Sequence, residues 1–181
     1  MDNKRLIPMP ERNPAQLANL GVCARSVWVV ECFDKHGRLK WRDGFENLVV
    51  TAGLNQLLDA TIKTGDAAPA WYVGLKDTGS VAAGDTMASH AAWATISPYS
   101  DANDPAFTAG SIAAGSVDNS AAKAVFNINA TDSVFGAFLK DNNTVDSATG
   151  TLYGGGDFSG ARSVESGDTL NVQITISVTA S

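Results

Sequence analysis

Two histidines and two cysteines are the residues of this 181-residue chain that proton transfer or nucleophilic attack would most readily use. His36 lies between Lys35 and Gly37, a sequence typical of a turn with solvated side chains. His90 lies in an alanine-rich segment, where histidine more often packs or caps than catalyses. No G-x-S-x-G, G-x-x-x-x-G-K-S/T or G-x-G-x-x-G pattern accompanies them. We therefore expect no enzymatic activity from this chain.

The two cysteines, Cys23 and Cys32, are nine residues apart. If both lie on one strand, this odd spacing places their side chains on opposite faces and excludes a bridge within that strand. Reduced, small apolar side chains are then the expected state. The cysteines and histidines form neither C-x-x-C nor H-E-x-x-H, so the sequence predicts no zinc site, although a site assembled from distant residues stays open.

Two segments rich in Asp and Asn offer the oxygen ligands that calcium prefers. One contains Asp101, Asn103 and Asp104, and the other contains Asp141, Asn142, Asn143 and Asp146. Neither segment follows the twelve-residue EF-hand pattern, and the same residue types build ordinary turns. We therefore expect surface loops here, with no metal ion and no cofactor.

Three consecutive glycines at 154–156 look at first like a phosphate-binding loop. They lack the lysine and the following helix that would direct a dipole toward an anion. The glycines therefore indicate either a tight turn or a surface that must come close to another backbone.

Exposed aromatic rings beside polar loops are typical of carbohydrate-binding sites. The candidates in this chain are Trp71, Tyr72, Trp93, Tyr99 and Tyr153. In a β protein such residues more often belong to the core, but glycan or host-receptor binding stays an alternative function.

Prolines 8, 10 and 14 shape the start of the chain, because proline blocks helices and central strands alike. We expect residues 1–20 to form an extended arm and residues 21–181 to form a single β-sandwich domain. The arm's candidate contact residues are Arg5, Pro8, Pro10, Arg12 and Pro14. The start of the chain shows no apolar stretch of signal-peptide length, and no run is long enough to span a bilayer, so neither secretion by that route nor a membrane partner is expected.

Short runs of β-forming residues separated by Gly, Asn, Asp and Ser dominate the rest. Residues 26–33 and 39–45 flank a turn at 35–37 and predict a hairpin. Further strands are predicted at 70–75, 93–96, 106–108, 124–128, 134–139, 150–153 and 170–179. In the last of these, five apolar residues alternate strictly with polar ones, which indicates a strand with one buried and one wet face: Leu170, Val172, Ile174, Ile176 and Val178.

One helix is predicted at residues 52–63, where leucine and isoleucine recur at helical spacing. Thr51 is placed to cap its start and Gly65 to end it. A second, short helix at 87–93 with Asp85 as its cap is a further possibility. Many short strands with one helix predict an all-β, antiparallel β-sandwich with a jelly-roll-like fold.

The charge of the chain is uneven along its length. Net charge is −6, and residues 1–46 carry eight basic and six acidic residues, whereas the remainder carries five basic and thirteen acidic ones. An acidic body repels phosphate backbones, so nucleic acid is not an expected partner. The basic N-terminal part suits either a solvated arm or an arm that docks on an acidic protein surface.

Seven segments between residues 25 and 180 form a recognisable pattern: NLVVTAGL (47–54), WYVGL (71–75), AAGDTMASHAAW (82–93), SVDNSAAKAVFNI (116–128), GAFL (136–139), LYGGGDFSG (152–160) and GDTLNV (167–172). This pattern resembles a family of small virion proteins of tailed bacteriophages, the capsid cement or decoration proteins. The resemblance implies a jelly-roll-like subunit that binds the outer face of the major capsid protein shell and stabilises it, and it carries over no catalytic residue.

The same resemblance implies where such a protein acts and with which partners. It implies location on the outer capsid surface of the virion, after a stay in the host cytoplasm during assembly, and a homodimer or homotrimer. A tail, adaptor or fibre-base component, or a receptor-binding module on the same fold, is the alternative.

Overall fold

The structure of the chain, a computed structural model, describes residues 21–63 and 67–180. The described residues form an antiparallel, sandwich-like β fold with one short helix, which confirms the predicted all-β class. The arm predicted for residues 1–20 lies outside the described residues, together with its candidate contact residues Arg5, Pro8, Pro10, Arg12 and Pro14.

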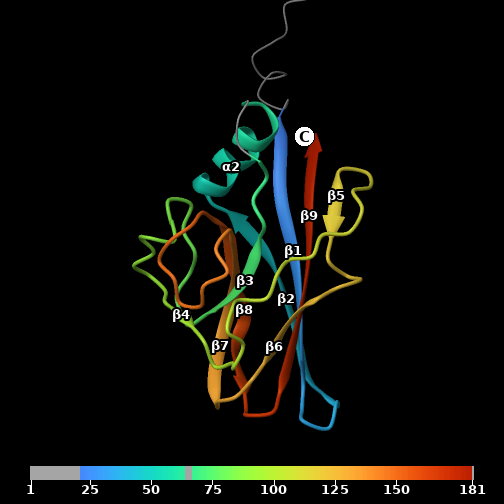
Figure 1. Cartoon of the computed structure of the whole chain (residues 1–181), viewed down its shortest axis with the longest axis vertical. Helices are drawn as coiled ribbons and strands as arrows, with labels where there is room; N and C mark the ends of the chain where they lie inside the picture. Colours follow the sequence, from blue (N-terminus) through green and yellow to red (C-terminus); the bar gives the residue numbers. More distant parts are fainter. Residues whose placement is uncertain (1–20, 64–66, 181) are drawn as a thin grey trace, which may run out of the picture.

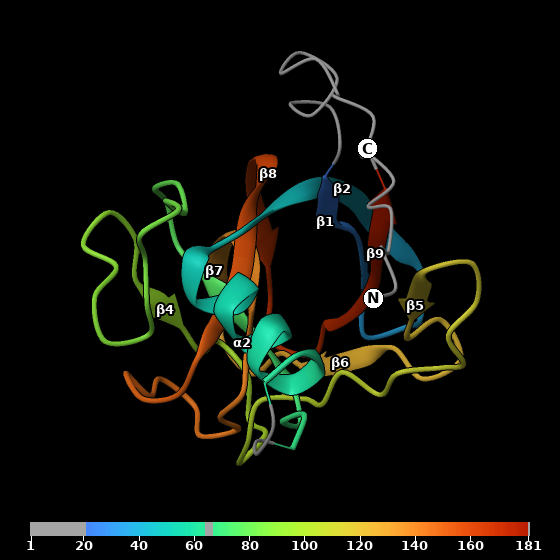
Figure 2. The same ribbon diagram turned by 90° about the horizontal axis from the view of Figure 1, so that it is seen from above.

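The strands form one path of hydrogen-bonded neighbours in the order β4-β3-β7-β8-β2-β1-β9-β5, and β6 also pairs with β9. Figure 1 and Figure 2 show β1 and β9 on one side of the molecule, β3, β7 and β8 on the other, and β2 crossing between them. The elements are β1 (Val22–Phe33), β2 (Leu39–Val49), α2 (Thr51–Thr61), β3 (Tyr72–Lys76), β4 (Thr95–Ile96), β5 (Ser116–Asp118), β6 (Ala124–Asn127), β7 (Asp132–Lys140), β8 (Leu152–Val164) and β9 (Thr169–Ala180).

Strand β2 joins the two layers. Most of its length pairs with β1, whereas only its last two residues pair with β8. Away from this short contact β2 and β8 have no backbone pairing, and aromatic rings fill the gap between them. The Phe45 ring stacks at 5.2 Å on Trp28 and lies 5.8 Å from Phe158, and the Trp41 ring lies 5.9 Å from Phe158.

Asp43 of β2 bridges the same gap with an ion pair. Its Oδ2 atom lies 2.6 Å from Nη2 of Arg162 and accepts a hydrogen bond of 2.9 Å from Oγ of Ser159, both on β8. Burial acts to raise the pKa of Asp43, but the bonds from Arg162, the Gly44 amide and Ser159 outweigh it, and the pKa is lowered. The carboxylate therefore stays charged and connects the two layers where backbone pairing does not.

Two buried clusters lie on opposite faces of strand β7, because successive side chains of a strand alternate in direction. Leu139 faces the main core between the layers, and Phe138 faces a smaller cluster. The loop of residues 77–94 covers this smaller cluster with Met87 and Trp93. The loop thereby adds a third layer over β3, β7 and β8.

The predicted hairpin and the predicted last strand are confirmed. The β1–β2 turn closes with a hydrogen bond of 2.9 Å from the Asp34 amide to the Arg38 carbonyl. Along β9 the predicted core residues Leu170, Val172 and Ile174 are buried. Ile176 is partly buried, and Val178 is 42% exposed. The sandwich thus opens at the end where β9 finishes.

The glycines at 154–156 lie inside β8, so the tight turn is wrong and the alternative, close approach to another backbone, is correct. A Cβ on Gly155 would lie 2.8 Å from the Ala137 carbonyl oxygen. A Cβ on Gly156 would lie 2.4 Å from the Phe45 ring. The run of glycines therefore makes room for the neighbouring strand and for the aromatic stack.

Helix α2 confirms the helix predicted at residues 52–63, but its start differs from the prediction. The N-cap is Val50, which supplies no side-chain hydrogen bond, and Thr51 is the first helical residue. The amide of Thr51 instead donates a hydrogen bond of 2.9 Å to the Ala83 carbonyl. The neighbouring loop therefore supplies the acceptor that a capping side chain would otherwise provide. Gly65 lies outside the described residues.

The short helix predicted at 87–93 is wrong, because this segment forms turns. The Asp85 carboxylate accepts hydrogen bonds of 2.9 Å from the Ala82 amide and from Nε1 of Trp93. The His90 ring stacks on the Trp93 ring at 4.0 Å. Side-chain bonds to the backbone compete with helix formation, and here they hold an irregular loop.

Gly53 is the one fully buried residue of α2, and Ala52 and Leu57 beside it are partly buried against the core. A Cβ on Gly53 would lie 2.3 Å from the Tyr153 carbonyl oxygen of β8, so the helix rests directly on that backbone. Of the apolar residues at helical spacing, Leu57 packs against the main core and is partly buried, whereas Leu54, Leu58 and Ile62 are exposed. Within the described residues no helix is long and apolar enough to cross a membrane.

We predict that Gly53→Ala destabilises the protein by about 1–3 kcal/mol, because the added methyl group pushes α2 away from β8. In an ordinary helix the same change stabilises by up to about 1 kcal/mol, so the sign of the effect is the test. The measurement is urea unfolding followed by circular dichroism. Gly84→Ala, where a Cβ meets nothing within 4 Å, is the control and should leave stability unchanged. Stabilisation by Gly53→Ala would contradict this packing.

Candidate functional site

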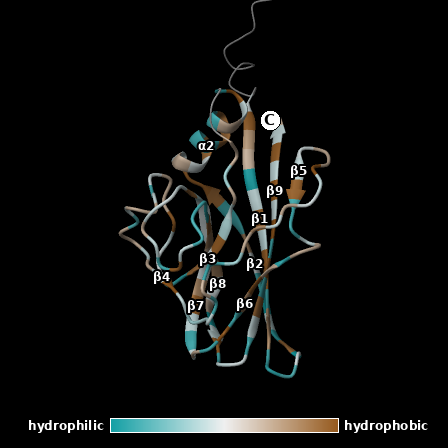
Figure 3. Ribbon diagram, viewed as in Figure 1, coloured by the Kyte–Doolittle hydropathy of each residue, from teal (hydrophilic) through white to brown (hydrophobic). Residues whose placement is uncertain are grey.

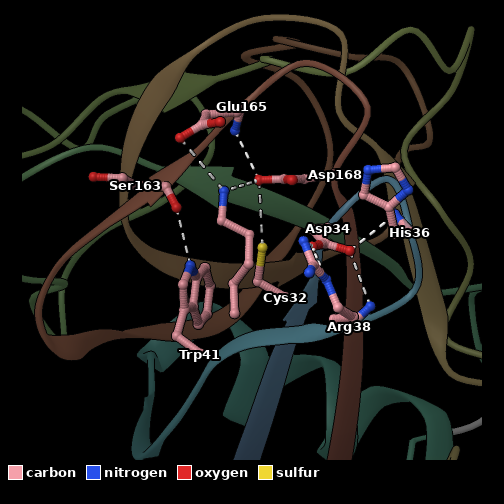
Figure 4. A network of polar contacts seen from close by, with 9 residues as sticks. Cys32, Asp34, His36, Arg38, Trp41, Ser163, Glu165 and Asp168 are labelled. Carbon is pink, nitrogen blue, oxygen red and sulfur yellow. Dashed lines mark hydrogen bonds and ion pairs between the residues drawn. The ribbon is translucent and has the colours of Figure 1, made fainter.

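The histidine predicted to lie in the hairpin turn borders a charged cleft, which Figure 4 shows from close by. This cleft has a volume of about 290 Å³ and is formed by the β1–β2 turn and the β8–β9 turn. His36 contributes a backbone amide that donates to Asp34 at 2.8 Å. The lining residues are Asp34, Lys35, His36, Arg38, Lys40, Glu165, Ser166 and Asp168.

Lys40 and Asp168 are the centre of this charged cleft. Nζ of Lys40 lies 2.6 Å from Oδ2 of Asp168 and 3.7 Å from Oε1 of Glu165. The same Asp168 oxygen accepts a bond of 2.8 Å from the Glu165 amide and lies 3.7 Å from Sγ of Cys32. The buried carboxylate therefore ties the turn before β9 to strands β1 and β2.

The thiol and the amine of this cluster are held in their unreactive forms. Burial, followed by the nearby Asp168 charge, raises the pKa of Cys32 to about 12. The hydrogen bond to Asp168 raises the pKa of Lys40. At neutral pH the sulfur is a thiol and the amine an ammonium ion, so neither is prepared for nucleophilic or base catalysis.

We predict that one thiol per folded chain reacts with maleimide at neutral pH, and that this thiol is Cys23. The two cysteines lie on β1, where the predicted opposite faces are confirmed: Cys23 is exposed and Cys32 is buried. Mass spectrometry of the labelled chain should show a second label only after unfolding in urea. Cys23→Ser is the control, and fast labelling of Cys32 in that folded variant would reveal a reactive thiol in the cleft.

The two acidic loops, which contain Asp104 and Asn143, lie next to each other. The cation that they contact is the side chain of Lys140. The Asp104 amide donates to the Asn143 carbonyl at 2.8 Å, and Oδ2 of Asp104 lies 2.8 Å from Nζ of Lys140. Both side chains of this pair are at most 1% exposed. Nζ of Lys140 also donates to the Thr144 carbonyl at 2.7 Å, and the hydroxyl of Tyr99 donates to Asp104.

Burial raises the pKa of Tyr99, so its phenol stays protonated and remains a donor to Asp104. The other carboxylates of these loops accept bonds from neighbouring groups of the protein: Asp101 from Asn127, Asp141 from the Thr151 amide, and Asp146 from Ser97. Among residues 21–63 and 67–180, no three His, Cys, Asp or Glu side chains gather as metal ligands. The predicted oxygen-rich loops are therefore joined by ion pairs and hydrogen bonds.

A second buried lysine, Lys76, lies on strand β3. Nζ of Lys76 donates to the carbonyls of Asp77 at 2.9 Å and Gly79 at 2.6 Å, and it forms an ion pair with Asp157 of β8. Its ammonium group lies 5.9 Å from the centre of the Trp93 ring. This lysine anchors the start of the loop that covers the smaller core.

We predict that Asp104→Asn costs about 3–5 kcal/mol of stability, because it leaves the ammonium of Lys140 buried without a counter-charge. Adding Lys140→Met to that variant should restore most of the loss. The control is Asp59→Asn, which breaks the exposed pair with Lys63 and should cost less than about 1 kcal/mol. Urea unfolding at pH 7 measures all three variants, and equal losses for the two aspartates would contradict the assignment.

The aromatic candidates for glycan binding mostly belong to the core. Trp93, Tyr99 and Tyr153 are buried. Trp71 is partly buried, with its ring edge-on to Tyr153 at a centroid distance of 5.4 Å, and Tyr72 is partly buried at the start of β3. These five rings do not form an exposed aromatic platform. They therefore offer no surface on which a glycan could stack.

An apolar groove of about 300 Å³ lies at the end of the molecule opposite the hairpin turn. One wall is Leu57 of α2, and the other walls come from β5, the segment before it and the end of β9. Figure 3 shows hydrophobic residues on β5 and along β9. The full lining is Leu57, Ile112, Gly115, Ser116, Val117, Ile176 and Val178.

Further exposed apolar side chains lie at the same end of the molecule as this groove, and we call these residues and the groove together the apolar end. Its members share large exposed hydrophobic side chains on α2, on the start of β1, on the end of β9 and on the segment before β5: Val22, Leu54, Leu58, Ile62, Ile112 and Val178. Residues 108–115 are all exposed and carry no charge. Asp59 and Lys63 pair with each other at 3.2 Å, so the described residues of this region present little unpaired charge.

Sequence reasoning did not identify the apolar end. The helical spacing of Leu54, Leu57, Leu58 and Ile62 predicted a helix, and such a stripe ordinarily marks the face packed on the core. Only Leu57 packs there. The glycine at position 53 was the available signal, because it allows α2 to rest on the core through its backbone and leaves the other three side chains exposed.

The comparisons with protein-family models and with curated proteins give the same result. No protein-family model matches the chain, and no curated protein matches it. A function is therefore inferred from the chemistry of the described residues and from the resemblance of the sequence segments.

Proposed function

We propose that this chain is a non-enzymatic capsid cement protein of a tailed bacteriophage, which binds the outer face of the major capsid protein shell and stabilises it. The observation that carries the proposal is the apolar end, an exposed surface with little unpaired charge on an otherwise acidic protein. Large exposed apolar side chains gathered around an apolar groove typically mark a site of protein–protein contact. The resemblance of the sequence segments supplies the class of partner.

The two ends of the molecule differ in the way that this role requires. The hairpin end carries the charged cleft, whose ion pairs suit contact with water. The opposite end carries the apolar groove, and β1 begins there, so residues 1–20 join the body at the same end. The apolar end and the arm face the shell together, while the hairpin end faces solvent on the virion.

The polar clusters support a structural role over catalysis. Lys40, Lys76 and Lys140 are each engaged by a carboxylate and by further partners within the protein. Groups saturated in this way stabilise loops and offer no free base or nucleophile to a substrate. A body with rigid loops suits a protein whose role is contact, and many such contacts on one particle together make a stable coat.

The remaining features of the proposal follow from charge and symmetry. The net charge of −6 disfavours nucleic acid as a partner and keeps the coated particle soluble. Cement proteins act as repeated copies, and we propose that this chain assembles as a homodimer or homotrimer on the outer capsid surface. Assembly takes place in the host cytoplasm.

The proposal predicts that the chain is present in hundreds of copies on purified heads of its phage and absent from isolated tails. Quantitative gel staining or mass spectrometry of separated heads and tails measures this directly. A handful of copies confined to tails would instead identify a tail, adaptor or fibre-base component. Binding of the pure chain to host cells would identify a receptor-binding module.

A matched pair of variants tests the surface itself. Leu58→Asp at the apolar end should weaken binding to heads that lack the protein by about tenfold or more, because a buried leucine contributes roughly 1.5–3 kcal/mol. Leu39→Asp at the hairpin end is the control, since Leu39 and Leu58 are 54% and 58% exposed. Equal binding of the two variants in a co-sedimentation assay would show that the apolar end is not the contact surface.

A further inference from the structure

One end of the path of hydrogen-bonded strands is a small hairpin beside the apolar groove. Strand β5 pairs with β9 on one side, and on its other side it pairs with the residues that precede it. The amides of Ala113 and Ser116 each donate to the carbonyl of the other residue at 2.9 Å. The Gly110 amide donates to the Asp118 carbonyl at 2.7 Å. Residues 108–113, which we call the edge arm, therefore lie on the outer side of β5.

The outer side of the edge arm presents backbone groups to a further strand. Successive residues of an extended strand direct their amide and carbonyl groups to opposite sides. Because both groups of Ala113 face Ser116, those of Ile112 point away from β5. Among the residues that the structure describes, the amides of Ala109, Ser111 and Ile112 donate to no acceptor of the protein. Such groups are satisfied by water or by a strand that adds to the edge.

The sequence of the edge arm lacks the features that usually protect a sheet edge. Exposed edges ordinarily carry charged side chains or proline, which oppose the addition of another strand. Residues 106–117 contain no charged residue and no proline, and residues 108–115 are all exposed. By contrast, β4 at the other end of the strand path is only two residues long, and Pro98 follows it closely. The edge arm is therefore the end of the path that can accept a strand.

A second copy of this chain has the geometry that such an edge requires. Two identical edges related by a two-fold axis pair in antiparallel fashion, so each copy offers the same donors and acceptors to the other. The net charge of −6 makes whole molecules repel each other. The edge arm itself carries no charge, so the repulsion is weakest where this edge meets its copy.

The apolar groove adds a hydrophobic contact to this backbone pairing. Ile112 lines the groove and is 80% exposed in the single chain. In an antiparallel pair, side chains directly opposite each other lie on the same face of the sheet and contact one another. The two Ile112 side chains therefore cover each other, and the two grooves open on the same face of the joined sheet.

We propose that two copies of this chain pair antiparallel through their edge arms, centred on Ile112, and form a two-fold homodimer. Of the homodimer and the homotrimer proposed above, this contact selects the dimer, because an antiparallel pair of identical edges closes at two copies. The inference goes beyond the proposed function and does not depend on capsid binding, because it concerns the purified chain.

Sedimentation velocity of the purified full-length chain at increasing concentration tests the dimer. The mass should rise from that of one chain to that of two. Ile112→Lys should raise the dimer dissociation constant about tenfold or more, because it places a charge at the paired edge. Ile112→Pro should act in the same direction, because it removes the outward amide. Ile62→Lys is the matched control, since Ile62 is 78% exposed on the segment after α2 and the change in charge is the same.

Hydrogen exchange followed by mass spectrometry locates the contact. Peptides that contain residues 108–113 should exchange more slowly at concentrations where the dimer forms than at concentrations where the chain is monomeric. Peptides that contain the exposed residues 82–84 should exchange at the same rate under both conditions. Urea unfolding checks that each variant remains folded.

Three outcomes would overturn the proposal. A chain that stays monomeric at every concentration would leave the edge arm to an extended segment of another protein. Dissociation caused by Ile62→Lys but not by Ile112→Lys would place the contact beside α2 instead. A trimer would exclude the two-fold pairing of edges. None of these results decides whether the protein binds capsids, which the Leu58→Asp variant tests on heads.

Discussion

The arrangement of the molecule depends on the passage of strand β2 from one layer to the other. β2 pairs with β1 over most of its length but with β8 at only two residues, so backbone hydrogen bonds cannot hold the layers together beyond that contact. Aromatic stacking around Phe45 and the ion pair between Asp43 and Arg162 replace them. The small residues of β8 leave room for this substitution, because a side chain at Gly156 would collide with the Phe45 ring.

The crossing of β2 between the two layers also makes the two ends of the molecule different. Where β2 meets β8 the chain turns directly into α2, and Gly53 rests on the backbone of Tyr153. A helix held there by its backbone buries only part of its apolar side chains, so Leu57 packs on the core and lines the groove while Leu54, Leu58 and Ile62 stay exposed. At the other end β2 leaves from a tight hairpin turn, where charged side chains pair with the β8–β9 turn. One end is therefore apolar and the other charged.

Lysines paired with carboxylates hold loops of the body in place. Lys40, Lys76 and Lys140 lie on three different strands, and each fixes a loop through a carboxylate and neighbouring acceptors. Such pairs contribute less to net stability than to the choice of one conformation, because each charge is costly when left without its partner. Residues that could have served chemistry thus hold loops in place, and the surface left for function is the apolar one.

The sequence by itself determined the elements whose pattern is local. The alternation in β9, the turn at Gly37, the helix after residue 50 and the opposite faces of the two cysteines all follow from the periods of strands and helices. Only the tertiary structure decided that the three glycines lie inside β8, that the acidic loops close on Lys140 and that most of the apolar stripe of α2 stays exposed. The physical reason is that a period specifies which side chains share a face, whereas burial depends on which distant segment covers that face.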